Sequence, residues 1–163
     1  MTDDSTKTVK VIALDPGRTT GYAVGTINDG KLGVVSGQAV WDEYQLYSQL
    51  KFANPDIIIY ESFQYRNKLD RADLYPCYLI GVINLYGAER ATQVRELLDH
   101  RPVVLYEQTP AQGKSYFADK QLKDSNVYKV GNPHANDAMR HILHWWTFGA
   151  GYRYNTGGYG SLA

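Results

Sequence analysis

The chain has 163 residues, and its 17 basic and 17 acidic side chains give a formal net charge of zero. This length is typical of one domain with its own hydrophobic core. Hydrophobic residues make up 44% and charged residues 21%, and no apolar run approaches the roughly 20 residues that span a bilayer, which excludes membrane insertion. Because the net charge is zero, a surface that binds nucleic acid must be a local feature.

The beginning of the chain and its single cysteine bear on where the protein works. The first ten residues, MTDDSTKTVK, are polar and partly acidic, whereas a secretory signal is basic and then apolar. We therefore expect a cytoplasmic protein. Cys77 is the only cysteine, which excludes an internal disulfide and a cysteine-based zinc cluster.

Three β-rich segments open the chain. VKVIALD (9–15) is an apolar strand that ends in Asp15 and is followed at once by Pro-Gly. TTGYAVGTI (19–27) and LGVVSGQAV (32–40) flank an Asp-Gly pair, which is typical of a β-hairpin. These segments predict a three-stranded antiparallel meander.

The rest of the chain alternates between helical and strand patterns. DIIIYESF (56–63) is a continuous apolar run, typical of a strand buried on both faces of a sheet, and it carries Glu61 near its end. Pro76 should kink or delay the helix that follows. In chain order we predict a helix over 41–53, this strand, a helix over 71–91 continued after an irregularity by 93–100, a strand over 102–108, a loop running into a short basic helix over 109–124, and a last helix over 132–148.

Together these elements predict an α/β fold with a mixed five-stranded sheet, in which three antiparallel strands precede parallel βαβ units and helices flank the sheet. Residues 1–148 would form one domain. The segment 149–163 is rich in Gly and Tyr without a period, and we expect it to be a flexible tail.

Three acidic residues take comparable positions in this scheme. Asp15 and Glu61 end strands, and Asp137 lies in the first turn of the last helix. Functional sites of open α/β sheets gather beyond the carboxyl ends of the strands. Carboxylates that meet there repel one another unless a cation lies between them, and Mg²⁺ or Mn²⁺ is the ion that prefers such oxygen ligands. Two such ions activate a water and stabilise the leaving oxygen of a phosphodiester.

The pattern resembles the RuvC-type Holliday junction resolvases of the ribonuclease H-like superfamily, a family with viral and phage members. The matching pieces, spread over residues 9–147, are LDPGRTTGYA, IIIYESF, PHANDAMRHIL and, more loosely, TPAQGKSYFADKQL. The resemblance implies a nuclease domain over 1–148 and a homodimer that nicks four-way DNA junctions in recombination and repair. It also implies that two Mg²⁺ or Mn²⁺ ions are held by the catalytic residues Asp15, Glu61, His134 and Asp137.

Several residues are candidates for DNA contact. The stretches 64–71 and 111–130 each carry a net positive charge, and the family has an aromatic residue near Phe63 and Tyr65 that stacks at the branch point. Arg140 and His141 follow Asp137 and could orient a phosphate or support the ligands. The predicted DNA-binding residues are Arg18, Phe63, Tyr65, Arg66, Lys68, Lys114, Lys120 and Lys123.

Other interpretations remain open at this point. A broader branched-DNA or flap endonuclease and a non-catalytic junction-binding protein both fit the sequence. LDPGRTTG also resembles the phosphate loop of actin-like and sugar-kinase ATPases, but those enzymes need two such lobes and 163 residues hold one. Taken singly, Asp15 could be a turn residue, Asp137 a helix N-terminal acid, His134 a structural histidine and each lysine part of a solvated face.

Overall fold

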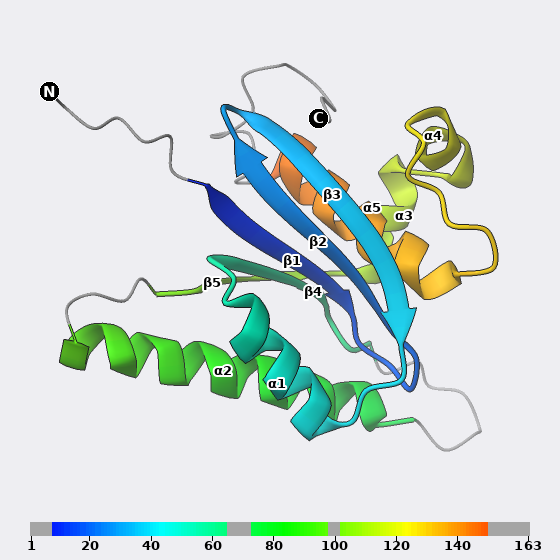
Figure 1. Cartoon of the computed structure of the whole chain (residues 1–163). Helices are drawn as coiled ribbons and strands as arrows, with labels where there is room; N and C mark the ends of the chain where they lie inside the picture. Colours follow the sequence, from blue (N-terminus) through cyan, green and yellow to red (C-terminus); the bar gives the residue numbers. More distant parts are fainter. Residues whose placement is uncertain (1–7, 65–72, 98–101, 150–163) are drawn as a thin grey trace, which may run out of the picture.

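The computed structural model describes residues 8–64, 73–97 and 102–149, and in this part of the chain a five-stranded sheet lies between helices (Figure 1). In chain order the elements are β1 (Val9–Asp15), β2 (Thr20–Asn28), β3 (Lys31–Ala39), α1 (Glu43–Ala53), β4 (Ile57–Glu61), α2 (Tyr75–Leu97), β5 (Val104–Gln108), α3 (Pro110–Tyr116), α4 (Asp119–Asp124) and α5 (Pro133–Phe148).

The sheet has the predicted mixed topology. Its strand order is β3-β2-β1-β4-β5, with antiparallel pairing among β1, β2 and β3 and parallel pairing of β4 with β1 and β5. Asp29 and Gly30 form the hairpin turn with φ values of 49° and 70°, as a two-residue turn with both φ values positive requires. Because β1, β4 and β5 are parallel, their carboxyl ends meet at one edge of the sheet.

Both faces of the sheet are buried, as alternation along β1 shows. Val11 and Ala13 pack in one cluster with α5, which contributes Trp145 and Trp146 among other residues. The alternating residues Ile12 and Leu14 pack in a second cluster with α1 and α2 (Figure 1). Burial on two faces explains why the strand sequences read as continuous apolar runs. Among the described helices, none is long and apolar enough to cross a membrane.

Helix α2 differs from the sequence prediction. We expected an irregularity before residue 93, but the helix continues without a break from Tyr75 to Leu97. Thr92, at the expected break, donates its hydroxyl hydrogen bond to the Ala88 carbonyl inside the helix. Pro76 lies in the first turn, where its missing N–H costs no helical hydrogen bond, so it delays the helix as anticipated.

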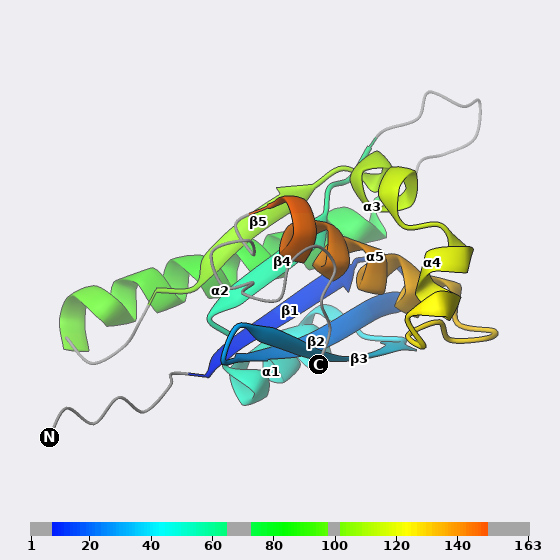
Figure 2. The same ribbon diagram turned by 90° about the horizontal axis from the view of Figure 1, so that it is seen from above.

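The segment 109–124 contains two short helices where we predicted a loop and one helix. Thr109 caps α3 in a capping box with Gln112, and Pro110 takes the first helical position. Figure 2 shows α3 and α4 at the end of the sheet where α5 begins. The predicted tail lies almost entirely outside the described residues.

Candidate active site

The structure brings the three predicted acids to one edge of the sheet. Asp15 ends β1, Glu61 ends the parallel neighbour β4, and Asp137 lies in the first turns of α5, which packs against both strands. Only 13%, 18% and 17% of the respective side chains are exposed. Acidic side chains are rarely this buried without partners.

Electrostatics link these acids. The pKa of the Asp15 carboxyl is raised from 3.8 to about 6, chiefly by burial and also by the negative charges of Glu61 and Asp137, whereas a hydrogen bond to His134 opposes the shift. A carboxylate that is buried beside two other carboxylates favours a proton or a cation. The edge of the sheet therefore carries excess negative charge.

His134 contacts Asp15. Its Nδ1 atom lies 2.9 Å from Asp15 Oδ2, and 43% of its side chain is exposed. Because α5 begins at Pro133, the first turn of the helix carries His134 directly to the end of β1.

Glu61 has a different histidine partner. The Nε2 atom of His141 lies 2.8 Å from Glu61 Oε2, and its Nδ1 atom lies 2.8 Å from Oε1 of Gln108, the last residue of β5. The imidazole is almost fully buried, with 2% of its side chain exposed. His141 thus joins α5 to the ends of two parallel strands.

Asp137 is held by two cationic side chains. Lys114 of α3 places Nζ 3.2 Å from Oδ2, and Arg140 places Nη1 2.5 Å from Oδ1. Arg140 also donates from Nε to the Phe117 carbonyl at 2.7 Å and forms an ion pair with Asp119. Arg140 is fixed by these contacts, whereas 55% of the Lys114 side chain is exposed.

We tested whether the donors suit a divalent metal. Among residues 8–64, 73–97 and 102–149, no three His, Cys, Asp or Glu side chains lie close enough to hold one ion, and each of the three acids contacts a histidine or a lysine. The chemistry of the donors nevertheless fits Mg²⁺ or Mn²⁺, which prefer carboxylate oxygens. Burial, and to a smaller extent the charges of Glu61 and Asp137, raise the pKa of Asp15, and a cation bound there would offset the cost of ionising this carboxyl.

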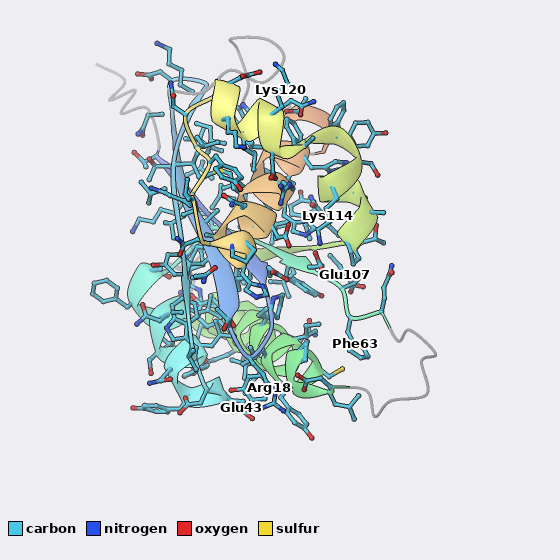
Figure 3. All side chains as sticks on the ribbon, turned by 90° about the vertical axis from the view of Figure 1, so that its right-hand side faces the viewer. Arg18, Glu43, Phe63, Glu107, Lys114 and Lys120 are labelled. Carbon is cyan, nitrogen blue, oxygen red and sulfur yellow. The ribbon has the colours of Figure 1, made fainter. Side chains whose placement is uncertain are left out.

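An open cavity of about 230 Å³ lies beside Glu61. Phe63, from the segment after β4, and Lys114 both line it, and Figure 3 shows these two side chains on the same side of the molecule. Pro16, Ser62, Gln64, Pro76 and Pro110 complete the lining. The cavity therefore joins the acidic edge to two of the predicted DNA-binding residues.

The other predicted DNA-binding residues either do not line this cavity or lie outside the described residues. Arg18 forms an ion pair with Asp73 at 2.9 Å, and its guanidinium lies over the ring of Tyr75 near α2 (Figure 3). On α4, Lys120 pairs with Asp124, and the Nζ atom of Lys123 lies 4.7 Å from the centre of the Tyr128 ring. Tyr65, Arg66 and Lys68 lie outside the described residues.

Sequence reasoning named most of these residues but not their partnerships. It placed His141 and Arg140 on the correct helix without assigning Glu61 and Asp137 as their partners, and it missed Gln108. A signal was present, since His134, Asp137 and His141 are spaced three and four residues apart and so share a helix face. No comparable signal links Lys114 to Asp137.

Comparisons with known proteins identify the fold. The sequence matches no protein-family model and no curated protein sequence. Two solved structures of Thermus thermophilus RuvC, one in complex with a Holliday junction substrate, match with TM-scores of 0.58 and 0.59 at 15% identity, over 83% of this chain and 92% of theirs. The yeast mitochondrial Holliday junction resolvase Ydc2 matches with a TM-score of 0.55 at 16% identity, over 84% of this chain and 77% of that chain.

These matches agree with the mixed five-stranded sheet of this chain. Because the sequence identity is low, the matches show only a shared architecture. The chemistry has to be argued from the residues of the site. The chain has the fold of the RuvC and Ydc2 resolvase structures.

Proposed function

We propose that this protein is a metal-dependent endonuclease that resolves four-way DNA junctions by hydrolysing phosphodiester bonds. The observation that carries the proposal is the meeting of three largely buried acids, Asp15, Glu61 and Asp137, at one sheet edge, where the pKa of Asp15 is raised to about 6. The fold supports it, because a solved RuvC structure of this fold is described as a complex with a Holliday junction substrate.

Two Mg²⁺ or Mn²⁺ ions would be held by Asp15, Glu61, His134 and Asp137. Bound there, the ions would supply a water activated at neutral pH and stabilise the leaving oxygen of the cleaved strand. The protein supplies rigidity, since Asp15 and Glu61 end paired strands and His134 and Asp137 lie on one helix. Preorganised ligands need little rearrangement during the reaction.

Lys114 would orient the phosphate. Its ammonium group lies beside Asp137 and lines the cavity next to Glu61, and its exposed stem allows it to turn toward DNA. Phe63 lines the same cavity and presents a ring to an unstacked base. Arg18, Lys120 and Lys123, together with Tyr65, Arg66 and Lys68, would contact the arms of the junction.

A junction has two equivalent strands, so we propose a two-fold homodimer that pairs through the outer face of α2. This face carries Tyr78 and Leu85, which are 57% and 62% exposed, with Gly81 and Ala88 on the same stripe, and Leu74, 48% exposed, directly precedes the helix. The spacing of three and four residues is that of a helix-pairing seam. Residues 75–88 contain no charged side chain, so no like charges oppose the pairing of two copies.

Cleavage of end-labelled synthetic junctions tests the function. Four-way junctions, three-way junctions, flaps and linear duplex are incubated with Mg²⁺, Mn²⁺ or chelator, using the wild-type protein and the variant Asp15→Asn. Asp29→Asn is the matched control, because Asp29 lies in the hairpin turn at the opposite end of the sheet. We expect the wild-type protein to make paired nicks in the four-way junction only. Chelator and the Asp15→Asn substitution should abolish these nicks, whereas Asp29→Asn should cleave like wild type.

Two other outcomes favour the alternative functions. Cuts on every branched form would favour a broader branched-DNA or flap endonuclease. Junction binding without cleavage would favour a non-catalytic junction-binding protein. Wild-type turnover in Asp15→Asn would contradict the proposed catalytic site.

A further inference from the structure

His141 is a buried polar residue that the proposed ligand set does not use. It lies four residues after Asp137 on α5, with 2% of its side chain exposed, and its two ring nitrogens each lie 2.8 Å from a side-chain oxygen. One oxygen belongs to Glu61 and the other to Gln108. Burying an imidazole is costly unless its nitrogens are hydrogen-bonded, and here both nitrogens have a partner.

We propose that His141 is a positioning residue that fixes the Glu61 carboxylate for binding a divalent cation, and that Gln108 holds the His141 ring in place. This inference rests on the proposed function, since it assigns Glu61 as a ligand. It concerns a contact that a ligand set of Asp15, Glu61, His134 and Asp137 does not include.

The backbone around the contact is rigid. Glu61 and Gln108 are register partners at the ends of the parallel strands β4 and β5, and the Ser62 amide donates to the Gln108 carbonyl at 2.7 Å. His141 reaches across from α5 and bonds the side chains of both strand ends. The side chains of Glu61 on β4, Gln108 on β5 and His141 on α5 are thus linked to one another, so each restricts the positions of the others.

Glu61 needs this support more than Asp15 does. A glutamate side chain has one more rotatable bond than an aspartate, and fixing it costs more conformational entropy. The contact between His141 Nε2 and Oε2 selects one orientation of the carboxylate, and in that orientation Oε1 would bind the cation. Hydrogen-bonded partners of this kind orient metal ligands in many proteins, and losing one typically weakens metal binding by about 10- to 100-fold.

Gln108 suits its place behind the ring. Its amide has a donor end and an acceptor end, and its Oε1 atom lies 2.8 Å from Nδ1. The side chain is 6% exposed, so water does not compete for Nδ1. Gln108 therefore holds the His141 ring from the side opposite Glu61.

Mn²⁺ binding by isothermal titration calorimetry tests the proposal on the whole protein, without relying on cleavage. The variants are His141→Leu, which removes the donor, and His141→Gln, which keeps an N–H group at a comparable reach. His144→Leu is the matched control, because His144 lies on the same helix, is 8% exposed and has a buried Nδ1 without a hydrogen-bond partner in the described structure.

We expect His141→Leu to weaken Mn²⁺ binding by about 10- to 100-fold, His141→Gln to recover most of the loss, and His144→Leu to bind like wild type. Cleavage by His141→Leu should return at high Mn²⁺ concentration. Melting curves and junction binding in chelator identify variants that are not folded. If His141→Leu does not fold, Gln108→Leu replaces it, with an expected loss of several-fold in Mn²⁺ affinity.

The experiment distinguishes failure of the positioning role from failure of the proposed function. Wild-type Mn²⁺ affinity in a folded His141→Leu or Gln108→Leu protein would overturn the positioning role and leave the proposed function intact. A loss that His141→Gln does not recover would also overturn it, because only packing would then explain the effect. A wild-type protein that neither binds Mn²⁺ nor cleaves any junction would overturn both proposals.

Discussion

Gly21 of β2 lies directly against the backbone of His134 in the first turn of α5. A Cβ atom built on Gly21 would stand 1.9 Å from the His134 carbonyl oxygen and 2.3 Å from its carbonyl carbon. Gly21 is also the register partner of Asp15. This close approach therefore brings α5 to the end of β1 and allows the His134 ring to contact Asp15.

The substitution Gly21→Ala should be strongly destabilising. The added methyl group would meet backbone atoms that cannot rotate away, so α5 must move, and overpacking of this kind costs about 1–3 kcal/mol. We expect urea unfolding to show a loss at or above that range, together with loss of cleavage. Gly81→Ala, made in the Leu85→Glu protein that should not pair through α2, is the control: apart from its own helix backbone, no atom of the described structure lies within 4 Å of its added Cβ, and a gain of about 0.5–1 kcal/mol is expected. Equal unfolding midpoints for Gly21→Ala and wild type would contradict the close packing.

The raised pKa of Asp15 predicts how stability depends on pH. In the folded protein Asp15 keeps its proton up to a pH of about 6, whereas a carboxyl at the ordinary value of 3.8 loses it earlier. Between these values the folded state binds more protons, so the free energy of unfolding falls as pH rises. The shift corresponds to about 3 kcal/mol at 1.36 kcal/mol per pKa unit.

Asp15→Asn removes this titration. Measured by urea unfolding in chelator, the variant should be more stable than wild type at pH 7.5, by an amount approaching about 3 kcal/mol, and the difference should shrink toward pH 4. A difference that stays constant across this pH range would contradict the assignment to Asp15.

Divalent cations should stabilise the wild-type protein. An ion that binds only the folded state adds about 2.7 kcal/mol at a concentration 100 times its Kd. Thermal melts at pH 7.5 should therefore shift upward with Mg²⁺ or Mn²⁺ and return with chelator, and Asp15→Asn should lose most of the shift. Equal shifts in both proteins would place the ion elsewhere.

The outer face of α2 predicts the oligomeric state. Leu85→Glu introduces a charge within the uncharged stripe, and the same charge on the second copy would repel it across the interface. We expect light scattering after size-exclusion chromatography to give a dimer for wild type and a monomer for this variant. Val35→Glu is the control, since Val35 is 67% exposed on β3. A monomeric wild type, or a dimer that survives Leu85→Glu, would contradict this interface.

The lysines of α4 should contribute to DNA binding through phosphate charges. Each of Lys120→Ala and Lys123→Ala should weaken junction binding and reduce the slope of log K against log salt concentration by about 0.9. Lys51→Ala is the control, because Lys51 pairs with Glu89 on the α1 and α2 side of the sheet. Slopes unchanged from wild type would place the DNA path away from α4.

The sequence predicted the elements that depend on local pattern. Apolar runs marked β1 and β4, the Asp-Gly pair marked the hairpin, and the acids Asp15 and Glu61 were correctly placed at strand ends. The break expected in α2 was wrong, because the helical hydrogen bonds continue through Thr92 where the sequence pattern is weak. Elements follow from residues close together in the chain, and the sequence records these directly.

Only the tertiary structure decided which side chains meet. His141 and Glu61 are 80 residues apart, Gln108 completes their contact from a third element, and Lys114 reaches Asp137 from a short helix that we had predicted as part of a loop. These contacts depend on strand register, on the approach of α5 that Gly21 permits, and on the burial that raises the pKa of Asp15. The sequence by itself determined which acids reach the sheet edge, whereas packing between distant segments determined their partners and their charge.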